Sequence, residues 1–156
     1  MSFLKKFLLS ALIISLISCT ASQKASKNIY GTWILRSVVT EGIGNAPSST
    51  FFDEASFSCF IGSEWKFNRG RRTGSFMLVD KRKDCPEITR KFTWEYKNSG
   101  TPALFFKRLN EDGTTKPNEV GFQYLLTDNS ASAMKIRQEV SINGQSGALI
   151  YNFVRQ

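Results

Sequence analysis

Few side chains of this sequence could carry out chemistry. The 156-residue chain has no histidine, which removes the commonest general base and the commonest metal ligand. Asp53 and Glu54 are adjacent, and Asp84 and Glu87 flank Cys85, but no base, nucleophile or ligand set accompanies these carboxylates. We therefore expect them to provide surface polarity, and we expect no enzyme activity, no metal and no cofactor.

The first cysteine follows a secretory signal. Lys5 and Lys6 precede an apolar run over residues 7–17, and a charged start before a short apolar core is typical of such signals. The run ends in Leu16-Ile17-Ser18-Cys19, which resembles the lipobox of bacterial lipoproteins. The resemblance implies cleavage before Cys19, a diacylglycerol on its sulfur and an acylated amino terminus. An ordinary signal peptide with an unrelated cysteine is the alternative.

This signal divides the chain into three parts. We expect a signal peptide over residues 1–18, a lipidated polar tether over residues 19–28 and one domain over residues 29–156. The formal charge is +8, and removal of Lys5 and Lys6 with the signal leaves +6. The expected partners are a membrane, reached through the lipid, and a small hydrophobic molecule, with no nucleic acid. We expect a monomer in the bacterial cell envelope, at the outer membrane.

The domain is expected to be all-β. Short alternations of apolar and polar residues, separated by turn residues, are typical of a sandwich or barrel. Eight such strands in simple order can close into an antiparallel up-and-down β-barrel, which leaves no free edge. The predicted strands cover residues 30–39, 59–68, 74–80, 90–97, 103–109, 120–127, 131–142 and 148–155. A helical turn is predicted at residues 50–55, within the loop after the first strand.

Alternation also predicts which side chains share a face. The expected apolar faces are Trp33, Leu35 and Val39 in the first strand; Phe92, Trp94 and Tyr96 in the fourth; and Met134, Ile136, Gln138 and Val140 in the seventh. Arg36 should lie on the opposite face of the first strand. One apolar face per strand suits an antiparallel sheet whose other side meets water.

Three short motifs resemble those of the lipocalin family. Gly31-Thr32-Trp33 opens the first predicted strand, like the lipocalin Gly-X-Trp signature. Thr127 and Asp128 fall in the predicted turn between the sixth and seventh strands, where lipocalins carry Thr-Asp-Tyr, with Asn129 replacing the tyrosine. Arg155 ends the last strand, where a lipocalin arginine packs over the signature tryptophan. The resemblance implies a lipocalin-like barrel, with all three sites at one end and an interior that binds a hydrophobic ligand.

The two remaining cysteines suggest a disulfide. An even number of cysteines in an exported domain favours pairing, although two buried free thiols are the alternative. In an up-and-down barrel, alternate loops share an end. Cys59 lies where the first loop enters the second predicted strand, and Cys85 lies in the third loop. Because the second and third strands are neighbours, the two thiols should meet at one mouth of the barrel.

The interior of the predicted barrel is rich in aromatic residues. An eight-stranded barrel is wide enough to be filled by its own side chains or to hold one small ligand, and both alternatives remain open. The candidate ligand-binding residues are Trp65, Phe67, Phe76, Trp94, Tyr96, Phe106, Phe122 and Tyr124.

Two functions follow from these alternatives. A cavity favours a carrier of a lipid-like molecule, whereas a filled barrel favours a surface interaction or inhibitor module, with an apolar loop around Phe51 and Phe52. Arg69, Arg71 and Arg72 crowd one turn. This turn shares its end of the barrel with the tether, so these arginines could rest on anionic lipid headgroups. A second basic run covers residues 81–83 and reads as a solvated loop.

Overall fold

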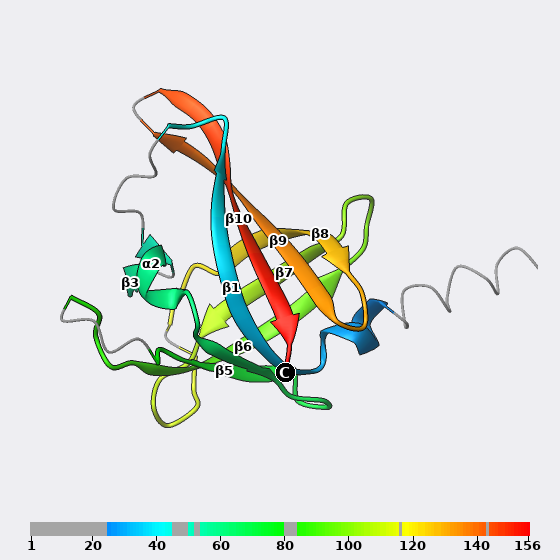
Figure 1. Ribbon diagram of the computed structural model, residues 1–156. Coiled ribbons are helices and arrows are strands. Elements are labelled where there is room, and N and C mark those ends of the chain that lie inside the picture. Colours follow the sequence, from blue (N-terminus) through cyan, green and yellow to red (C-terminus); the bar gives the residue numbers. More distant parts are fainter. Residues whose placement is uncertain (1–24, 45–49, 52–53, 80–83, 116, 143) are drawn as a thin grey trace, which may run out of the picture.

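The computed structural model describes residues 25–156 except 45–49, 52–53, 80–83, 116 and 143 (Figure 1). Within these ranges, eight antiparallel strands close into one barrel, because β1 pairs with both β10 and β4. The predicted all-β, up-and-down architecture is therefore confirmed. The barrel strands are β1 (Gly31–Glu41), β4 (Glu64–Phe67), β5 (Thr73–Met77), β6 (Thr89–Lys97), β7 (Ala103–Arg108), β8 (Phe122–Asn129), β9 (Ala133–Ile142) and β10 (Gln145–Arg155).

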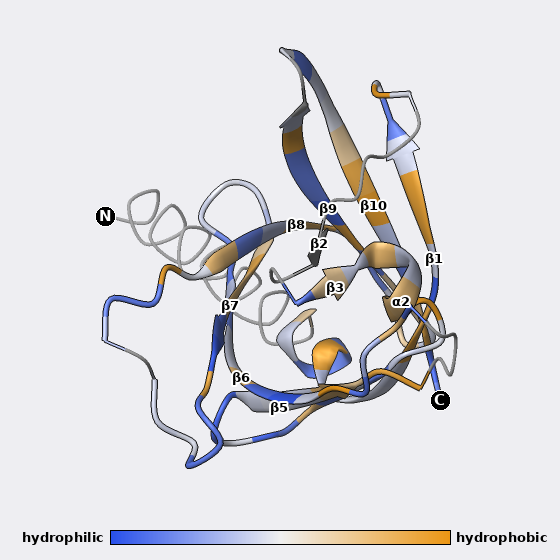
Figure 2. Cartoon of the chain, turned by 90° about the vertical axis from the view of Figure 1, so that its left-hand side faces the viewer, coloured by the Kyte–Doolittle hydropathy of each residue, from blue (hydrophilic) through white to orange (hydrophobic). Residues whose placement is uncertain are grey.

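Three small elements lie between β1 and β4. Strands β2 (Thr50–Phe51) and β3 (Ala55–Ser56) pair with each other, and helix α2 (Phe57–Phe60) follows directly. Figure 2 looks into the barrel from the end where β3 and α2 lie, which we call the mouth. We call residues 54–60 the cover segment, because they lie across this mouth.

The course of the cover segment corrects two predictions. The helical turn is at Phe57–Phe60, whereas Thr50–Phe51 and Ala55–Ser56 are extended, and the second barrel strand begins at Glu64 rather than at Cys59. Cys59 and Phe60 are both buried, at 2% and 0% exposure. Consecutive residues of a strand point to opposite faces, while a helical turn can bury two neighbours together.

Two β-bulges correct the predicted positions of other side chains. In β1 the register with β10 shifts between Leu35 and Ser37, so Arg36 is the additional residue. The alternation changes phase there, and Val39 is 50% exposed instead of facing inward. In β8 the register with β9 shifts between Leu126 and Asp128. Thr127 and Asp128 therefore lie within β8 and not in the turn that follows it.

The end of the barrel opposite the mouth is closed around Trp33. The guanidinium carbon of Arg155 lies 4.3 Å from the centroid of the Trp33 ring, as the lipocalin resemblance implied. Arg155 donates hydrogen bonds to the carbonyl oxygens of Asn28, Tyr30 and Ala131. One side chain thus connects the start of β1, the end of β10 and the turn between β8 and β9.

The chain before β1 completes this closed end. Residues 25–29 form a helical turn, although residues 25–28 were assigned to the tether. Trp33 Nε1 donates to the Ile29 carbonyl oxygen at 2.9 Å, and Asn129 Nδ2 donates to the Ala25 carbonyl oxygen at 2.6 Å. Asn129, which replaces the signature tyrosine, therefore fastens the helical turn to the barrel.

Gly31 is needed where Arg155 crosses the start of β1. Its φ of +121° is a conformation that residues with a side chain rarely adopt, and a Cβ there would lie 2.4 Å from Arg155 Nη1. The glycine of the first signature motif therefore makes room for the arginine of the last.

Replacement of Arg155 by alanine should destabilise the barrel strongly. It removes three charge-assisted hydrogen bonds and the cation–π contact, so we expect a loss of about 2–4 kcal/mol in the free energy of unfolding, measured by urea titration. Arg137→Ala is the control, because Arg137 pairs with the exposed carboxylates of Glu41 and Glu139 and should contribute about 1 kcal/mol or less. Equal losses in the two variants would contradict the assigned role of Arg155.

Candidate functional site at the mouth of the barrel

The candidate ligand residues lie in the barrel core. Six are buried (Trp65, Phe67, Phe76, Trp94, Phe106 and Tyr124), and Tyr96 and Phe122 are partly buried against them. The rings touch one another: Trp65 and Phe76 have centroids 4.9 Å apart, and Phe106 and Tyr124 have centroids 5.6 Å apart. Among the described residues, the middle of the barrel is therefore occupied by packed aromatic side chains.

Other aromatic residues belong to the same cluster and were not among the candidates. Phe92 and Phe153 each contact Trp65, at centroid distances of 5.7 Å and 5.6 Å, and Tyr151 contacts Tyr124 at 5.9 Å. Burial raises the pKa of the Tyr151 hydroxyl, which donates a hydrogen bond to Gln138 Oε1 at 2.8 Å. The polar end of this buried side chain is therefore satisfied within the barrel.

Two arginines continue the inward rows of β6 and β7 to the mouth. Arg90 precedes buried Phe92 by two residues, and Arg108 follows buried Phe106 by two residues. Because alternate residues of a strand share a face, both arginines belong to the same face as the aromatic cluster. The cross-strand neighbour of Arg90 is Phe76, and that of Arg108 is Phe92. Positive charge therefore borders the aromatic core at the mouth.

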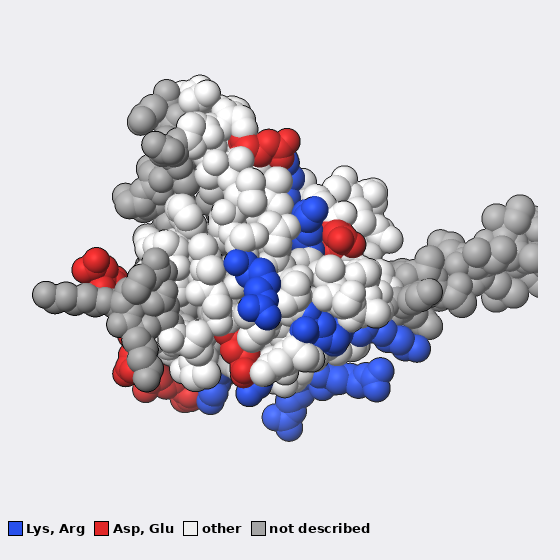
Figure 3. All heavy atoms as spheres, viewed as in Figure 1, with Lys and Arg blue, Asp and Glu red and all other residues white. Residues whose placement is uncertain are grey.

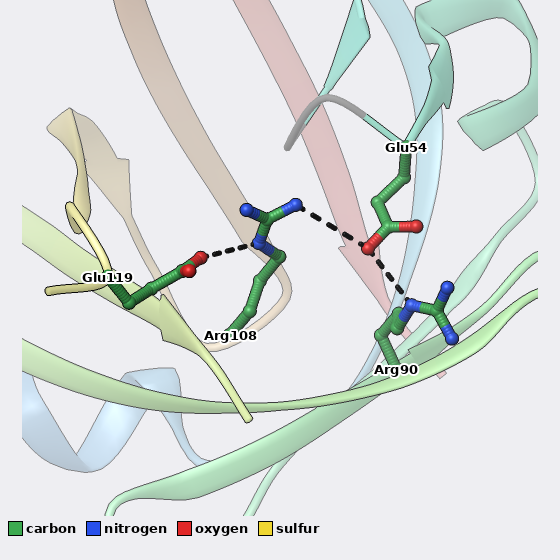
Figure 4. A network of polar contacts seen from close by, with 4 residues as sticks. All are labelled: Glu54, Arg90, Arg108 and Glu119. Carbon is green, nitrogen blue, oxygen red and sulfur yellow. Dashed lines mark hydrogen bonds and ion pairs between the residues drawn. The ribbon is translucent and has the colours of Figure 1, made fainter. Parts of the chain in front are cut away.

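These arginines belong to a network with two carboxylates (Figure 4). Glu54 Oε1 lies 2.9 Å from Arg90 Nε and 3.7 Å from Arg108 Nη1. Glu119 Oε1 accepts a hydrogen bond from Arg108 Nε at 2.6 Å. The carboxylate side chains are only 13% and 10% exposed. Glu54 was predicted to be a solvated surface carboxylate, and that prediction is wrong, because it is largely buried against two arginines.

Local contacts hold the guanidinium groups of both arginines in place. The hydrogen bond with Glu54 raises the pKa of Arg90, so this guanidinium stays positively charged. Arg108 also lies over the Phe122 ring, with 5.6 Å between the guanidinium carbon and the centroid. A planar guanidinium can bind a carboxylate through two parallel hydrogen bonds.

An open pocket of about 490 Å³ lies beside this network. Its volume falls within the usual range for small-molecule sites. It is not the apolar interior cavity that the sequence offered as one alternative, because charged and polar side chains contribute much of its wall. The lining residues are Glu54, Thr89, Arg90, Lys91, Arg108, Leu109, Asn110 and Glu111.

The disulfide fixes the cover segment to the loop between β5 and β6. Cys59 of α2 is bonded to Cys85 in the loop between β5 and β6, as the barrel topology predicted. Next to Cys59, the Phe60 ring enters the aromatic cluster, with its centroid 5.2 Å from that of Phe76. The cover segment therefore contributes both a charge and an apolar ring to the mouth.

Several other functional predictions concern residues that the structure does not describe. Cys19, Phe52, Asp53 and residues 81–83 lie outside the described residues. Within the described part of the chain, no group of three or more Cys, Asp or Glu side chains is arranged to hold a metal ion. None of its helices is long and apolar enough to cross a membrane.

The energetic role of the network can be measured with a double-mutant cycle. Arg108→Met leaves the Glu119 carboxylate partly buried without its hydrogen-bond donor, so we expect a loss of about 2–3 kcal/mol in the free energy of unfolding. Glu119→Gln in the same chain should recover part of that loss, with a coupling energy of about 1 kcal/mol or more. Strictly additive losses would mean that the two side chains do not stabilise each other.

Comparison with known proteins agrees with the barrel and its signatures. The family described as lipocalin-like domain matches residues 29–131, which is well over half of the chain. No match was found among curated proteins or among solved structures. The matched region includes Gly31, Trp33, the aromatic strands and both mouth arginines, and the remaining strands close the barrel as the fold requires. The chain therefore belongs to the lipocalin-like domain family.

Proposed function

We propose that this protein is a lipoprotein of the bacterial cell envelope that binds or carries a small hydrophobic molecule at the mouth of its barrel. Lipocalin-like barrels are in general suited to such ligands. The observation that supports a site at the mouth is the position of Arg90 and Arg108 on the inward face, bordering Phe76 and Phe92. Binding and transport without catalysis is the proposed role.

Export and anchoring are parts of this proposal. The disulfide between Cys59 and Cys85 supports an oxidising compartment, since thiols in the cytosol are kept reduced. Lipidation of Cys19 rests on the resemblance of residues 16–19 to the lipobox. Two or more acyl chains on one residue would hold the domain stably at a membrane. The domain is proposed to act there as a monomer, with no nucleic-acid partner.

A second candidate function is a surface interaction or inhibitor module. The packed aromatic interior favours it, because a filled barrel leaves binding to the outer surface. Three apolar side chains near the mouth are also exposed: Ile61 at 39%, Met77 at 43% and Val79 at 46%. Val79 also lies close to Gly62, which follows Ile61 in the chain. Its Cγ2 atom is 3.8 Å from the position that a Cβ on Gly62 would occupy.

The carrier proposal can be tested by native mass spectrometry. We expect residues 19–156 with Cys19→Ser, incubated with a bacterial lipid extract, to retain one lipid-like molecule per chain. Phe122→Asp, which places a charge beside Arg108, should abolish retention, whereas Lys135→Ser on the outer face of β9 should not. If the mass spectrum shows no bound lipid under any condition, this would contradict the carrier role and favour the interaction module.

The orientation on the membrane forms a separate part of the proposal. The turn between β4 and β5 holds exposed Arg69, Arg71 and Arg72 at the closed end. Arg69 lies over Tyr30, next to the start of β1, with 5.6 Å between the guanidinium carbon and the ring centroid. Lys and Arg side chains gather at the lower right of the face in Figure 3, whereas Asp and Glu lie at its lower left. A basic closed end would rest on anionic headgroups, and the mouth would then face away from the membrane.

This orientation predicts a local effect of charge on membrane binding. Arg71→Ser with Arg72→Ser should weaken binding of the unlipidated chain to phosphatidylglycerol vesicles about 30-fold, at about 1 kcal/mol for each arginine. Vesicle sedimentation measures this binding. Arg36→Ser with Lys91→Ser removes the same charge from other parts of the surface and should have little effect. Equal weakening by both pairs would indicate attraction by net charge alone.

A further inference from the structure

The cover segment has the chemical character of an amphipathic anion. Glu54 provides a carboxylate, and Phe60, six residues later, provides an apolar ring that is 0% exposed. The carboxylate is held by Arg90 and Arg108. The ring is held by Phe76 and Trp65, at centroid distances of 5.2 Å and 6.3 Å.

The two holding sites are neighbours on the barrel wall. Phe76 of β5 and Arg90 of β6 are cross-strand partners, as are Trp65 and Phe76. Directly opposed residues of antiparallel strands have Cβ atoms about 4.5–5.5 Å apart. A molecule with a charged head and an apolar body could therefore reach both sites at once without entering the packed middle of the barrel.

The balance of charges around the pocket indicates the sign of the net charge of such a molecule. The described charged residues of the pocket and its network are Arg90, Lys91 and Arg108 against Glu54, Glu111 and Glu119. These charges cancel, and withdrawal of Glu54 leaves one positive charge uncompensated. A monoanion restores the balance, whereas a neutral or cationic ligand would leave one positive charge of the partly buried pair Arg90 and Arg108 without a counter-ion, because Arg108 keeps its ion pair with Glu119.

The construction of the mouth allows Glu54 to withdraw. Among the described residues, β3, which follows Glu54, pairs with β2 through two residues on each side, and β2 and β3 form a sheet separate from the barrel. Glu119 lies just before β8, and both arginines belong to barrel strands. The disulfide at Cys59 joins the cover segment to the loop after β5, so the segment would stay near the mouth after it moves.

We propose that the cover segment occupies the ligand site as an internal substitute, and that the ligand is an amphipathic anion such as a long-chain carboxylate. Its head replaces the Glu54 carboxylate on Arg90 and Arg108, and its apolar chain replaces Phe60 against Phe76 and Trp65. This inference rests on the proposed carrier function and specifies its ligand class. An internal competitor weakens apparent binding, because the observed association constant is the intrinsic constant multiplied by the fraction of molecules in which the site is open.

Competition by Glu54 is tested with a pair of carboxylate variants. The probes are dodecanoate and its neutral analogue dodecanol, titrated against residues 19–156 with Cys19→Ser by isothermal calorimetry. Glu54→Gln keeps the size of the side chain and removes its charge, so dodecanoate should bind roughly two- to fivefold more tightly. Glu87→Gln, which changes an exposed carboxylate in the loop before β6, should leave the affinity unchanged.

Recognition of the head is tested with the arginines. Arg90→Gln and Arg108→Gln, each alone, should weaken dodecanoate at least tenfold and should not weaken the binding of dodecanol, which has no charged head. Retained dodecanol binding also reports that the variant is folded with an intact apolar site.

The outcomes of these experiments distinguish the role of Glu54 as an internal substitute from the carrier function on which it rests. Tighter binding by Glu54→Gln, together with loss of selectivity in the arginine variants, supports the internal substitute. The inference is overturned if dodecanoate binds equally to the parent chain and to Glu54→Gln, or if dodecanol binds as tightly as dodecanoate. The carrier function would survive either result. No binding of either probe, together with no adduct from the lipid extract, overturns both.

Discussion

Closing eight strands into one barrel leaves an interior about as wide as the side chains that line it. In this protein aromatic rings occupy that space, and their contacts continue from Trp65 through Phe106 to Tyr124. Interiors packed in this way resist the loss or gain of even small groups. The consequence for function is geometric, because a ligand finds room only where the inward rows of side chains reach an end of the barrel.

The two ends of the barrel are closed by different kinds of interaction. At one end Arg155 lies over Trp33 and bonds three backbone carbonyls of the barrel and the preceding turn. At the other end a short segment is held by ion pairs through Glu54, by one buried ring and by a disulfide between loops. Ion pairs that are partly exposed to water stabilise a contact only modestly. In the proposed binding of an amphipathic anion, the mouth is the end that opens, by exchange of these ion pairs.

Much of this organisation could be predicted from the sequence because strand alternation and barrel topology are regular. The apolar faces of β6 and β9 and the pairing of Cys59 with Cys85 follow from those rules. The placement of Arg155 over Trp33 was implied by the resemblance to lipocalins. The change of phase at Arg36 could not be predicted, because a bulge depends on the partner strand. The contact of Glu54 with Arg90 joins a loop to a strand 36 residues away, and no periodicity encodes such a path. Arg90 and Arg108 did carry a signal, since each continues an inward aromatic row.

The central claim, that the cover segment stands in the place of a bound amphipathic anion, is tested most directly by a crystal structure of residues 19–156 with Cys19→Ser, grown with dodecanoate. The account predicts the ligand carboxylate on Arg90 and Arg108, with Glu54 displaced and the apolar chain against Phe76. Electron density for dodecanoate elsewhere, with Glu54 still on both arginines, would contradict it.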